Sequence, residues 1–355
     1  MTGDDTKHLP LEDQHTAAGA RFGAFAGWSM PLTYPAGVMK EHLHTREHAG
    51  LFDISHMKLF EVSGPGAAAL LNRACPLDAG ALEISQSKLS FFLNEAAGII
   101  DDLIVTRLGD TRFMVVANAG NAVADEKHLR ALAADFDVKV DALDRVFLAI
   151  QGPEAWAALS RAGIETGSLL FMHGIEPKQN WFMSRSGYTG EDGFEIGLPE
   201  ADARALVAKL LEDERVLWIG LAARDSLRLE AGLCLHGQDI TPEIDLASAG
   251  LMWAIPKEIR ASGSFGFKKV LAVSASCGTT SKIAITLLPL PTSPPSRSPV
   301  VSAIASLLLS KPINRYCFII PGSKCTFKKT LSATAKNVCV TSFTNTFSAS
   351  LISSR

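Results

Sequence analysis

The last quarter of this 355-residue chain contains no acidic residue. All 37 Asp and Glu lie within residues 1–266, whereas residues 267–355 carry eleven Lys and Arg. Charged residues make up about 25% of an ordinary globular chain, so about ten acids would be expected in a folded domain of that length. We therefore expect residues 1–266 to form the folded region. Residues 267–355 are expected to be a basic, Ser- and Thr-rich tail that is not a native domain and is out of frame or joined in error.

Other absences each exclude a class of protein. No apolar run approaches the roughly 18 residues of a membrane span, and the start of the chain has neither an apolar nor an Arg-rich leader, so a cytoplasmic location is expected. The six cysteines form no CxxC and no zinc spacing, so no metal is expected. No G-x-G-x-x-G and no P-loop occurs, which argues against a dinucleotide or nucleotide site. A net charge of −3 gives no indication of nucleic acid or membrane as a partner.

Strand-like and helix-like segments alternate irregularly along residues 1–266. The apolar runs 103–108 and 111–118 flank Gly109 and Asp110, which is typical of a β-hairpin. Helical spacing of apolar residues recurs over 125–136, 154–162 and 202–214, and further helix-like runs cover 37–50, 67–75 and 220–234. Residues 51–62 are expected to be a turn leading into a strand. This mixture, with a clear antiparallel hairpin, favours an α+β fold over a doubly wound parallel sheet.

Two adjacent carboxylates, Asp101 and Asp102, stand at the start of an apolar strand. Because neighbours on a strand face opposite sides, one can point into a pocket while the other caps a turn or meets solvent. A carboxylate at the mouth of an apolar site can hold a proton or receive one from a substrate nitrogen. The alternative is an Asp pair that only forms a turn before the strand.

Two further segments carry residue types that suit a ligand. Residues 187–193 hold three glycines, which permit tight turns and close approach of the backbone to a ligand. Tyr188 offers a flat face to a ring, and Glu195 interrupts an apolar strand, where a carboxylate needs a partner. Arg224 and Arg228 share a helix face, and a guanidinium suits carboxylates and ring heteroatoms. The alternatives are an ordinary hairpin loop with an edge-strand Glu and a solvated helix face.

Five segments together resemble the aminomethyltransferase family, the T-protein of the glycine cleavage system. They occur in the family's order and span about residues 16–266; they are Phe25–Pro31, Leu51–Met57, Gly98–Thr106, Gly187–Gly193 and Gly220–Leu233. The resemblance implies two interleaved α+β lobes of the T-protein folate-binding fold. The family's C-terminal β-barrel has no counterpart in residues 267–355, so an unrelated tail is expected in its place.

The resemblance also implies an activity. Such enzymes take an aminomethyl group from the dihydrolipoyl arm of the H-protein and pass the one-carbon unit to tetrahydrofolate, releasing ammonia and giving 5,10-methylenetetrahydrofolate. Tetrahydrofolate is then the co-substrate, and the lipoylated H-protein is the partner. By resemblance Asp102 is the catalytic carboxylate facing N10 of the folate, with Asp101 as the alternative. The expected folate-binding residues are Glu195, Arg224 and Tyr188 and, as weaker matches, Asn118, Phe171 and Met57.

Two other functions remain open at this point. One is a different folate-dependent transferase, such as a demethylase, which the full matches at 98–106 and 220–233 argue against. The other is a folate-binding protein without transferase activity, either a defective product or a protein of the iron–sulfur assembly type. The assembly proteins carry a K-G-C-Y-x-G-Q-E motif, and the nearest stretch here, Gly232–Asp239, matches it poorly.

Overall fold

The computed structural model describes residues 6–262, 316–318 and 327–329. Its contacts divide the chain into two units, Met1–Ser276 and Cys277–Arg355. In the second unit, the described residues form an antiparallel pair of short strands, β15 (Tyr316–Phe318) and β16 (Phe327–Lys329). The boundary expected at residue 266 and the expected character of the tail lie outside the described residues, so they stay predictions.

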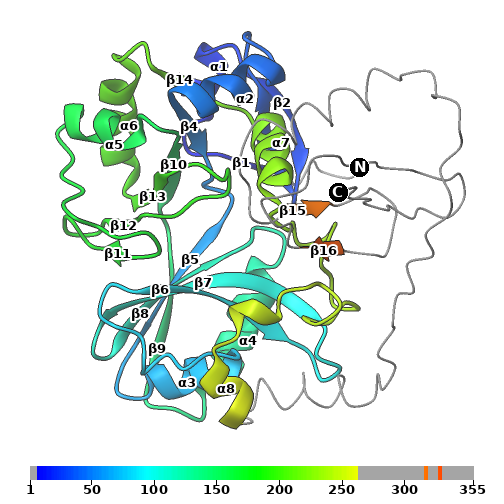
Figure 1. Cartoon of the computed structure of the whole chain (residues 1–355). Coiled ribbons are helices and arrows are strands. Elements are labelled where there is room, and N and C mark those ends of the chain that lie inside the picture. The colour runs from blue at the N-terminus through cyan, green and yellow to red at the C-terminus, as the bar shows by residue number, and fades with distance from the viewer. Residues whose placement is uncertain (1–5, 263–315, 319–326, 330–355) are drawn as a thin grey trace, which may run out of the picture. The chain divides into compact units, whose positions relative to one another are not determined.

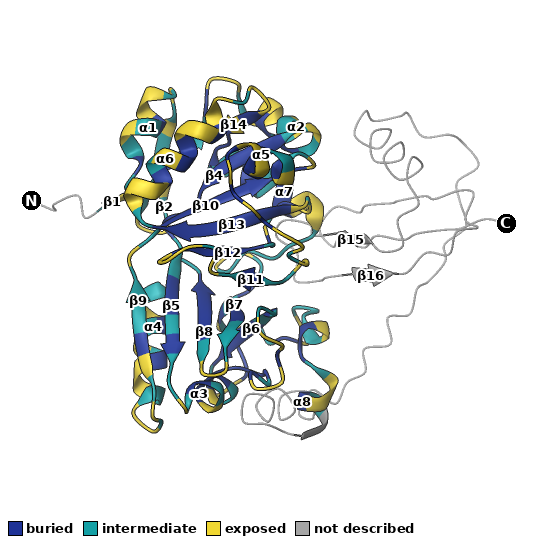
Figure 2. Ribbon diagram, turned by 90° about the vertical axis from the view of Figure 1, so that its left-hand side faces the viewer, coloured by how far each residue is buried: buried dark blue, intermediate teal, exposed yellow. Residues whose placement is uncertain are grey.

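The first unit contains a six-stranded sheet with the strand order β11-β12-β13-β10-β4-β14. Its neighbours pair antiparallel except for β14 and β4, which run parallel. The strands are β4 (Ala49–Asp53), β10 (Val146–Gln151), β11 (Gly174–Ile175), β12 (Phe182–Ser184), β13 (Gly193–Leu198) and β14 (Val216–Trp218). Every residue of β4, β10 and β13 is buried (Figure 2), because the helices α5 (Ala155–Arg161) and α6 (Glu200–Leu211) contribute to the core beside these strands.

A second sheet of five antiparallel strands has the order β6-β7-β8-β5-β9. Its strands are β5 (Lys58–Ser63), β6 (Ser87–Leu93), β7 (Ile99–Gly109), β8 (Arg112–Ala117) and β9 (Lys139–Leu143). The helices α3 (Ala67–Ala74) and α4 (Ala122–Ala133) bury apolar residues in one cluster with Leu103 and Val105 of β7. One face of β7 is therefore covered by helices.

Smaller elements complete the described part of the first unit. The strands β1 (Lys7–His8), β2 (Arg21–Phe25) and β3 (Trp28–Thr33) form a third sheet, in the order β1-β3-β2. The remaining helices are α1 (Glu12–Ala17), α2 (Val38–Glu47), α7 (Leu221–Ala231), a 3-10 turn (Met252–Ala254) and α8 (Lys257–Ser262). The helices α2 and α7 lie side by side (Figure 1), and α7 also contacts β3.

The two large sheets are interleaved in sequence. The chain leaves the six-stranded sheet after β4, builds the whole five-stranded sheet, and returns to the first sheet at β10. A cluster of buried residues joins the sheets, with Phe52 and Phe147 from one and Leu59 and Met114 from the other. The α+β class predicted from the sequence is thus confirmed.

The predicted helices and strands match the structure best where turn residues and the spacing of apolar residues indicate the same element. The expected hairpin is β7 and β8, joined at Asp110 and Thr111. The helix expected over 125–136 instead spans Ala122–Ala133. The segment 51–62, expected to be a turn leading into a strand, is the end of β4, a turn and then β5, because the chain changes sheets there. Within the described residues, no helix combines the length and the apolar composition needed to cross a bilayer.

Candidate active site

The two neighbouring aspartates of β7 face opposite sides of the five-stranded sheet, as strand alternation predicts. Asp101 shares the face of Leu103 and Val105, which α3 and α4 cover, and it is fully buried. Asp102 lies on the other face with Ile104, which packs into the cluster between the two sheets. Only Asp102 therefore lies on the face of this sheet that packs against the six-stranded sheet.

Burial is the main reason why the pKa of Asp102 rises to about 7, and the nearby charge of Asp101 raises it further. A hydrogen bond from Asn118 opposes this shift, with the amide Nδ2 lying 3.0 Å from Oδ1 of Asp102. A carboxyl group with a pKa near neutrality exchanges protons readily at physiological pH. The geometry therefore suits Asp102, more than Asp101, for proton transfer.

Asp101 is instead tied into a polar network. It accepts hydrogen bonds from the backbone N of Asn118 at 3.1 Å, from the side chain of Asn118 at 3.0 Å and from Asn121 at 2.7 Å. The Asn121 amide nitrogen also lies 2.9 Å from Nδ1 of His236, whose Nε2 is 3.0 Å from the carbonyl of Ile99. Asp101 thus fixes the start of α4 against β7.

Tyr188, Arg224 and Glu195 form the opposite side of the candidate site. The guanidinium carbon of Arg224 lies 4.9 Å from the centre of the Tyr188 ring, within range of a cation–π contact. The charges of Arg224 and Glu195 interact across the site, although burial lowers the pKa of the arginine and raises that of the glutamate. Burial raises the pKa of the Tyr188 hydroxyl, and the negative charge of Asp102 raises it further. Tyr188 therefore interacts electrostatically with Asp102.

Glu195 and Arg224 are both almost completely buried, and one nitrogen of Arg224 has no hydrogen-bond partner in the described residues. Glu195 is 4% exposed and accepts a hydrogen bond from the Ser186 hydroxyl at 2.8 Å. Arg224 is 8% exposed, and its Nη1 has no partner in the described part of the chain. Because an unsatisfied buried donor costs free energy, a ligand acceptor at this nitrogen would be favourable.

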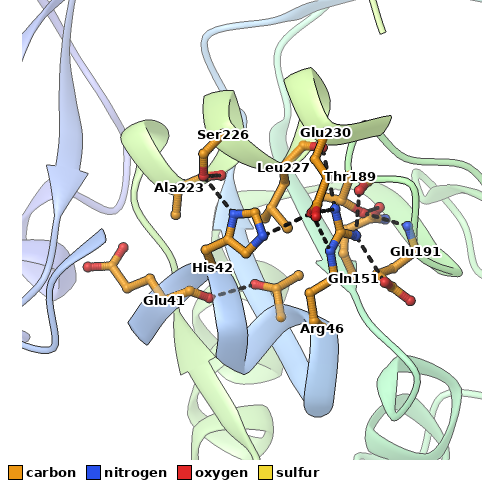
Figure 3. A network of polar contacts seen from close by, with 11 residues as sticks. Glu41, His42, Arg46, Gln151, Thr189, Glu191, Ala223, Ser226, Leu227 and Glu230 are labelled. Atoms are coloured by element: carbon orange, nitrogen blue, oxygen red, sulfur yellow. Dashed lines mark hydrogen bonds and ion pairs between the residues drawn. The ribbon is translucent and has the colours of Figure 1, made fainter. Parts of the chain in front are cut away.

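The glycine-rich loop that carries Tyr188 is held from two directions. Gln151, fully buried, donates to the carbonyl of Ser186 at 2.9 Å and accepts from the Thr189 hydroxyl at 2.8 Å. Arg46 of α2 donates to the carbonyl of Thr189 at 2.7 Å and to Glu191 at 2.9 Å (Figure 3). These hydrogen bonds fix the loop to β10 and α2. The sequence had left open the alternative of an ordinary hairpin loop, which would not need such contacts.

The helix α7, which carries Arg224, is also fixed at both ends. A buried carboxylate, Glu41, accepts the backbone N–H of Gly220 at 2.7 Å just before the helix begins, where negative charge is favourable. At the other end, Arg228 is 2% exposed and donates to Asp225 at 2.8 Å and to the carbonyl of Leu233 at 3.1 Å. The alternative of a solvated helix face is therefore wrong for both arginines.

Of the weaker expected pocket residues, Asn118 donates to both aspartates, whereas Met57 and Phe171 make other contacts. Met57 is half-buried in the turn between β4 and β5 and packs against the cluster between the sheets. Phe171 is 66% exposed, and no hydrogen bond or ring contact in the described residues joins it to Tyr188 or Arg224. The structure thus does not bring Phe171 together with the central residues.

Sequence reasoning missed His56, which belongs to the site by its surroundings. It is 7% exposed, its Nδ1 has no partner in the described residues, and its ring meets Phe25 edge-on with centroids 5.7 Å apart. Burial, followed by the charge of Arg224, lowers its pKa to about 3, so the imidazole is neutral at pH 7. The Ser-His-Met sequence was the only available signal, and an isolated histidine is weak evidence.

The donor set offers little to a metal. In residues 6–262 and the two short strands, no group of three or more His, Cys, Asp or Glu side chains is arranged to hold an ion. The carboxylates of the site are engaged by amide and hydroxyl donors instead. The arrangement therefore suits binding of a polar ring compound and transfer of a proton.

Comparison with known proteins identifies the family. The family model for the GCVT N-terminal domain matches residues 11–258. The chain is 39% identical over 279 residues to the mitochondrial aminomethyltransferase of Homo sapiens, covering 75% of this chain and 68% of that protein. The chain belongs to the aminomethyltransferase family.

Further relatives agree. The mitochondrial aminomethyltransferase of Dictyostelium discoideum is 38% identical over 284 residues, covering 74% of this chain and 70% of that protein. The crystal structure of glycine cleavage system aminomethyltransferase T from Bartonella henselae is 61% identical, with a TM-score of 0.75 over 76% of this chain and 75% of that one. The resemblance drawn from the sequence is confirmed, and the chain is an aminomethyltransferase enzyme of the glycine cleavage system.

One expectation is wrong. The relatives from Homo sapiens, Dictyostelium discoideum and Flaveria anomala are all named as mitochondrial, which contradicts the expected cytoplasmic location. That expectation rested on the composition of the first residues of the sequence.

Proposed function

We propose that this aminomethyltransferase moves a one-carbon unit from the aminomethyl group on the lipoyl arm of the H-protein to tetrahydrofolate. The bonds from the one-carbon unit to sulfur and to nitrogen break, so the dihydrolipoyl thiol and ammonia are released and 5,10-methylenetetrahydrofolate is formed. The observation that carries the proposal is the placement of Asp102, whose carboxyl shares the side-chain amide of Asn118 with Asp101 and whose pKa is raised to about 7 by burial. Family membership supports the choice of both substrates.

In this reaction Asp102 orients N10 of the folate and accepts its proton as the bond from nitrogen to the one-carbon unit forms. The ionised carboxyl is the form that can do this, and a pKa of about 7 makes that form accessible near neutral pH. Asn118 holds the carboxyl in place through its amide. Asp101 contributes through this amide and does not touch the substrate.

Glu195 and Arg224 bind the pterin ring of the folate. Glu195 accepts from the ring's N–H groups, while the unpartnered Nη1 of Arg224 donates to a ring acceptor. Tyr188 packs beside the ring and is held by the carbonyl of Cys234, to which its hydroxyl donates. The folate supplies the one-carbon chemistry, and the protein supplies orientation, which accounts for much of the rate.

The test is transfer by Asp102→Asn, in which the shape of the side chain is retained and its charge is lost. With aminomethylated H-protein and tetrahydrofolate, we expect the turnover number to fall about 10²- to 10⁴-fold while folate affinity stays close to wild type. Asp110→Asn is the matched control, because the Asp110 side chain lies in the turn after β7 and is 88% exposed. Full activity of Asp102→Asn would overturn the role given to Asp102.

The wild-type protein tests the reaction itself. Formation of 5,10-methylenetetrahydrofolate and ammonia in equal amounts supports the proposal. Folate binding without product would favour the alternative of a binding protein that lacks transferase activity. Product only from an N-methylated amine, and none from the H-protein, would favour a demethylase.

A further inference from the structure

Residues 233–246, which follow α7, contact both large sheets, and we refer to them as the strap. Toward the six-stranded sheet, the carbonyl of Cys234 accepts from the hydroxyl of Tyr188, in the loop between β12 and β13. Toward the five-stranded sheet, the backbone N–H of Ile99 donates to the carbonyl of Ile244 at 3.1 Å. The strap therefore reaches from the loop that carries one side of the site to strand β7, which carries the other.

One side chain of the strap, His236, makes a hydrogen bond with each of its ring nitrogens. Its Nε2 lies 3.0 Å from the carbonyl oxygen of Ile99, which can only accept, so Nε2 carries a proton. Its Nδ1 lies 2.9 Å from the side-chain nitrogen of Asn121, which can only donate, so Nδ1 carries none. These two contacts fix the imidazole as the neutral tautomer with its proton on Nε2.

The amide of Asn121 connects this imidazole to the two aspartates of β7. Its nitrogen also donates to Oδ1 of Asp101 at 2.7 Å, and because a carboxylate can only accept, the amide is oriented with its nitrogen toward both partners. The amide nitrogen has two protons, so one serves His236 and the other serves Asp101. Asp101 in turn shares the amide of Asn118 with Asp102, at 3.0 Å from each carboxyl. A continuous chain of hydrogen bonds therefore joins the strap to Asp102.

We propose that His236 is a positioning residue: through Asn121 it holds the strap, and with it the carbonyl that binds Tyr188, at a fixed place relative to Asp102. An imidazole with a second proton would set an N–H against the N–H of Asn121, so only the neutral form makes this connection. The effect on transfer rests on the function proposed above, whereas the hydrogen bonds and the tautomer do not.

The tautomer is measured directly by ¹⁵N NMR of the full chain labelled in its histidine rings. At pH 8 we expect the ring of His236 to carry its proton on Nε2 and none on Nδ1. Its resonances are assigned by their loss in His236→Gln and their persistence in His8→Gln, the matched control at a side chain that is 63% exposed. A ring protonated at Nδ1, or one that exchanges between the two tautomers, would overturn the proposal.

Two variants of similar shape separate the two hydrogen bonds of His236. In His236→Asn the side-chain oxygen can take the place of Nδ1 and accept from Asn121, whereas in His236→Gln the amide nitrogen can take the place of Nε2 and donate to Ile99. With aminomethylated H-protein and tetrahydrofolate, we expect the turnover number to fall about 10-fold in His236→Gln and to stay within about 2-fold of the wild type in His236→Asn. The reverse order would mean that only the bond to Ile99 matters, and equal losses would show a merely structural role. Either result would overturn the proposal.

A double-mutant cycle tests whether the effect passes through Asn121. Adding His236→Gln to Asn121→Ala should cause almost no further loss of turnover, because the amide that His236 would hold is already absent. Losses that add in the double variant would overturn the proposal.

The remaining outcomes are also decisive. If His236→Gln does not fold, His236→Asn decides: a turnover number lowered about 10-fold or more would overturn the proposal. If the wild type transfers nothing, the proposed function fails, and the tautomer seen by NMR still supports or overturns the hydrogen bonds assigned to His236.

Discussion

Asn118 holds Asp102 at two points, through the carboxyl Oδ1 at 3.0 Å and through the backbone carbonyl at 2.9 Å, both from its side-chain amide. Asn118 directly follows β8 and Asp102 lies in β7, so pairing of the hairpin strands sets the orientation of the carboxyl. The hydrogen bond lowers the pKa of Asp102, while burial and the charge of Asp101 raise it. The balance between these effects predicts the pH dependence of the enzyme.

The turnover number of the wild type should rise with pH, with a midpoint near the Asp102 pKa of about 7. Below that pH the carboxyl is protonated and cannot accept the folate proton; above it the ionised base is present. Asn118→Ala removes the hydrogen bond that lowers this pKa, so its midpoint moves to higher pH. A pH–rate profile from pH 5.5 to 9 measures both, with Asp110→Asn as a control that leaves the midpoint unchanged. A flat wild-type profile would contradict the prediction.

Arg224→Lys should weaken tetrahydrofolate binding about 10-fold, although the charge is kept. An ammonium group lacks the planar fork and the face that Arg224 places 4.9 Å from the centre of the Tyr188 ring. Calorimetric titration with tetrahydrofolate gives the dissociation constant. Arg130→Lys is the control, because among the described residues Arg130 pairs only with Glu126, on the exposed face of α4. Unchanged affinity in Arg224→Lys would remove Arg224 from the folate site.

Arg228 would be a poor comparison for Arg224, although the two share a helix face in the sequence. Arg228 is buried and holds the segment after α7 through Asp239 and the carbonyl of Leu233. That segment supplies the carbonyl of Cys234, which accepts from Tyr188. Loss of Arg228 would therefore disturb the segment that holds Tyr188, and so the site, indirectly. The four-residue spacing alone cannot distinguish this structural role of Arg228 from the binding role expected for Arg224.

The sequence predicted the elements of the fold well and their arrangement poorly. Periodicity and turn residues located the β7–β8 hairpin and most helices to within a few residues. The crossing from β4 to β5 within 51–62 was missed, because a local pattern does not reveal to which sheet a strand belongs. The interleaving of the two lobes was available only from the resemblance to the family.

The site shows the same limit. Strand alternation correctly predicted that Asp101 and Asp102 face opposite sides of the sheet, because this depends only on the two-residue period of a strand. Asn121 and His236 could not be assigned, because their roles arise from contacts between distant segments. His56 was visible only as an isolated histidine, and its burial beside Arg224 depends on tertiary packing.

Gly187→Ala should destabilise the protein and reduce transfer. A Cβ atom at this position would lie 1.8 Å from Oε1 of Gln151 and 2.3 Å from its Cδ, so the loop or the buried glutamine must move. We expect a loss of about 1–3 kcal/mol in the free energy of unfolding, as for other overpacked sites. Gly109→Ala is the matched control, since its Cβ would come no closer than 3.9 Å to Arg112. Urea denaturation compares them, and equal stability of the two variants would show that the loop is not fixed by Gln151.

The stability of the wild type should fall with rising pH more steeply than that of Asp125→Asn. Asp125 lies in the first turn of α4, is fully buried, and neither of its oxygens has a hydrogen-bond partner in the described residues, so burial raises its pKa. The pKa of Asp125 is about 9 in the folded protein and about 3.9 in an unfolded chain. Between these values the folded state binds a proton that the unfolded state has released, so this contribution to stability is complete below pH 4 and is lost progressively up to pH 9. The two slopes should differ by up to about 1.4 kcal/mol per pH unit. Urea denaturation between pH 5 and 9 measures them, with Glu126→Gln expected to follow the wild type. Parallel curves for the wild type and Asp125→Asn would mean that Asp125 is already ionised in the folded protein.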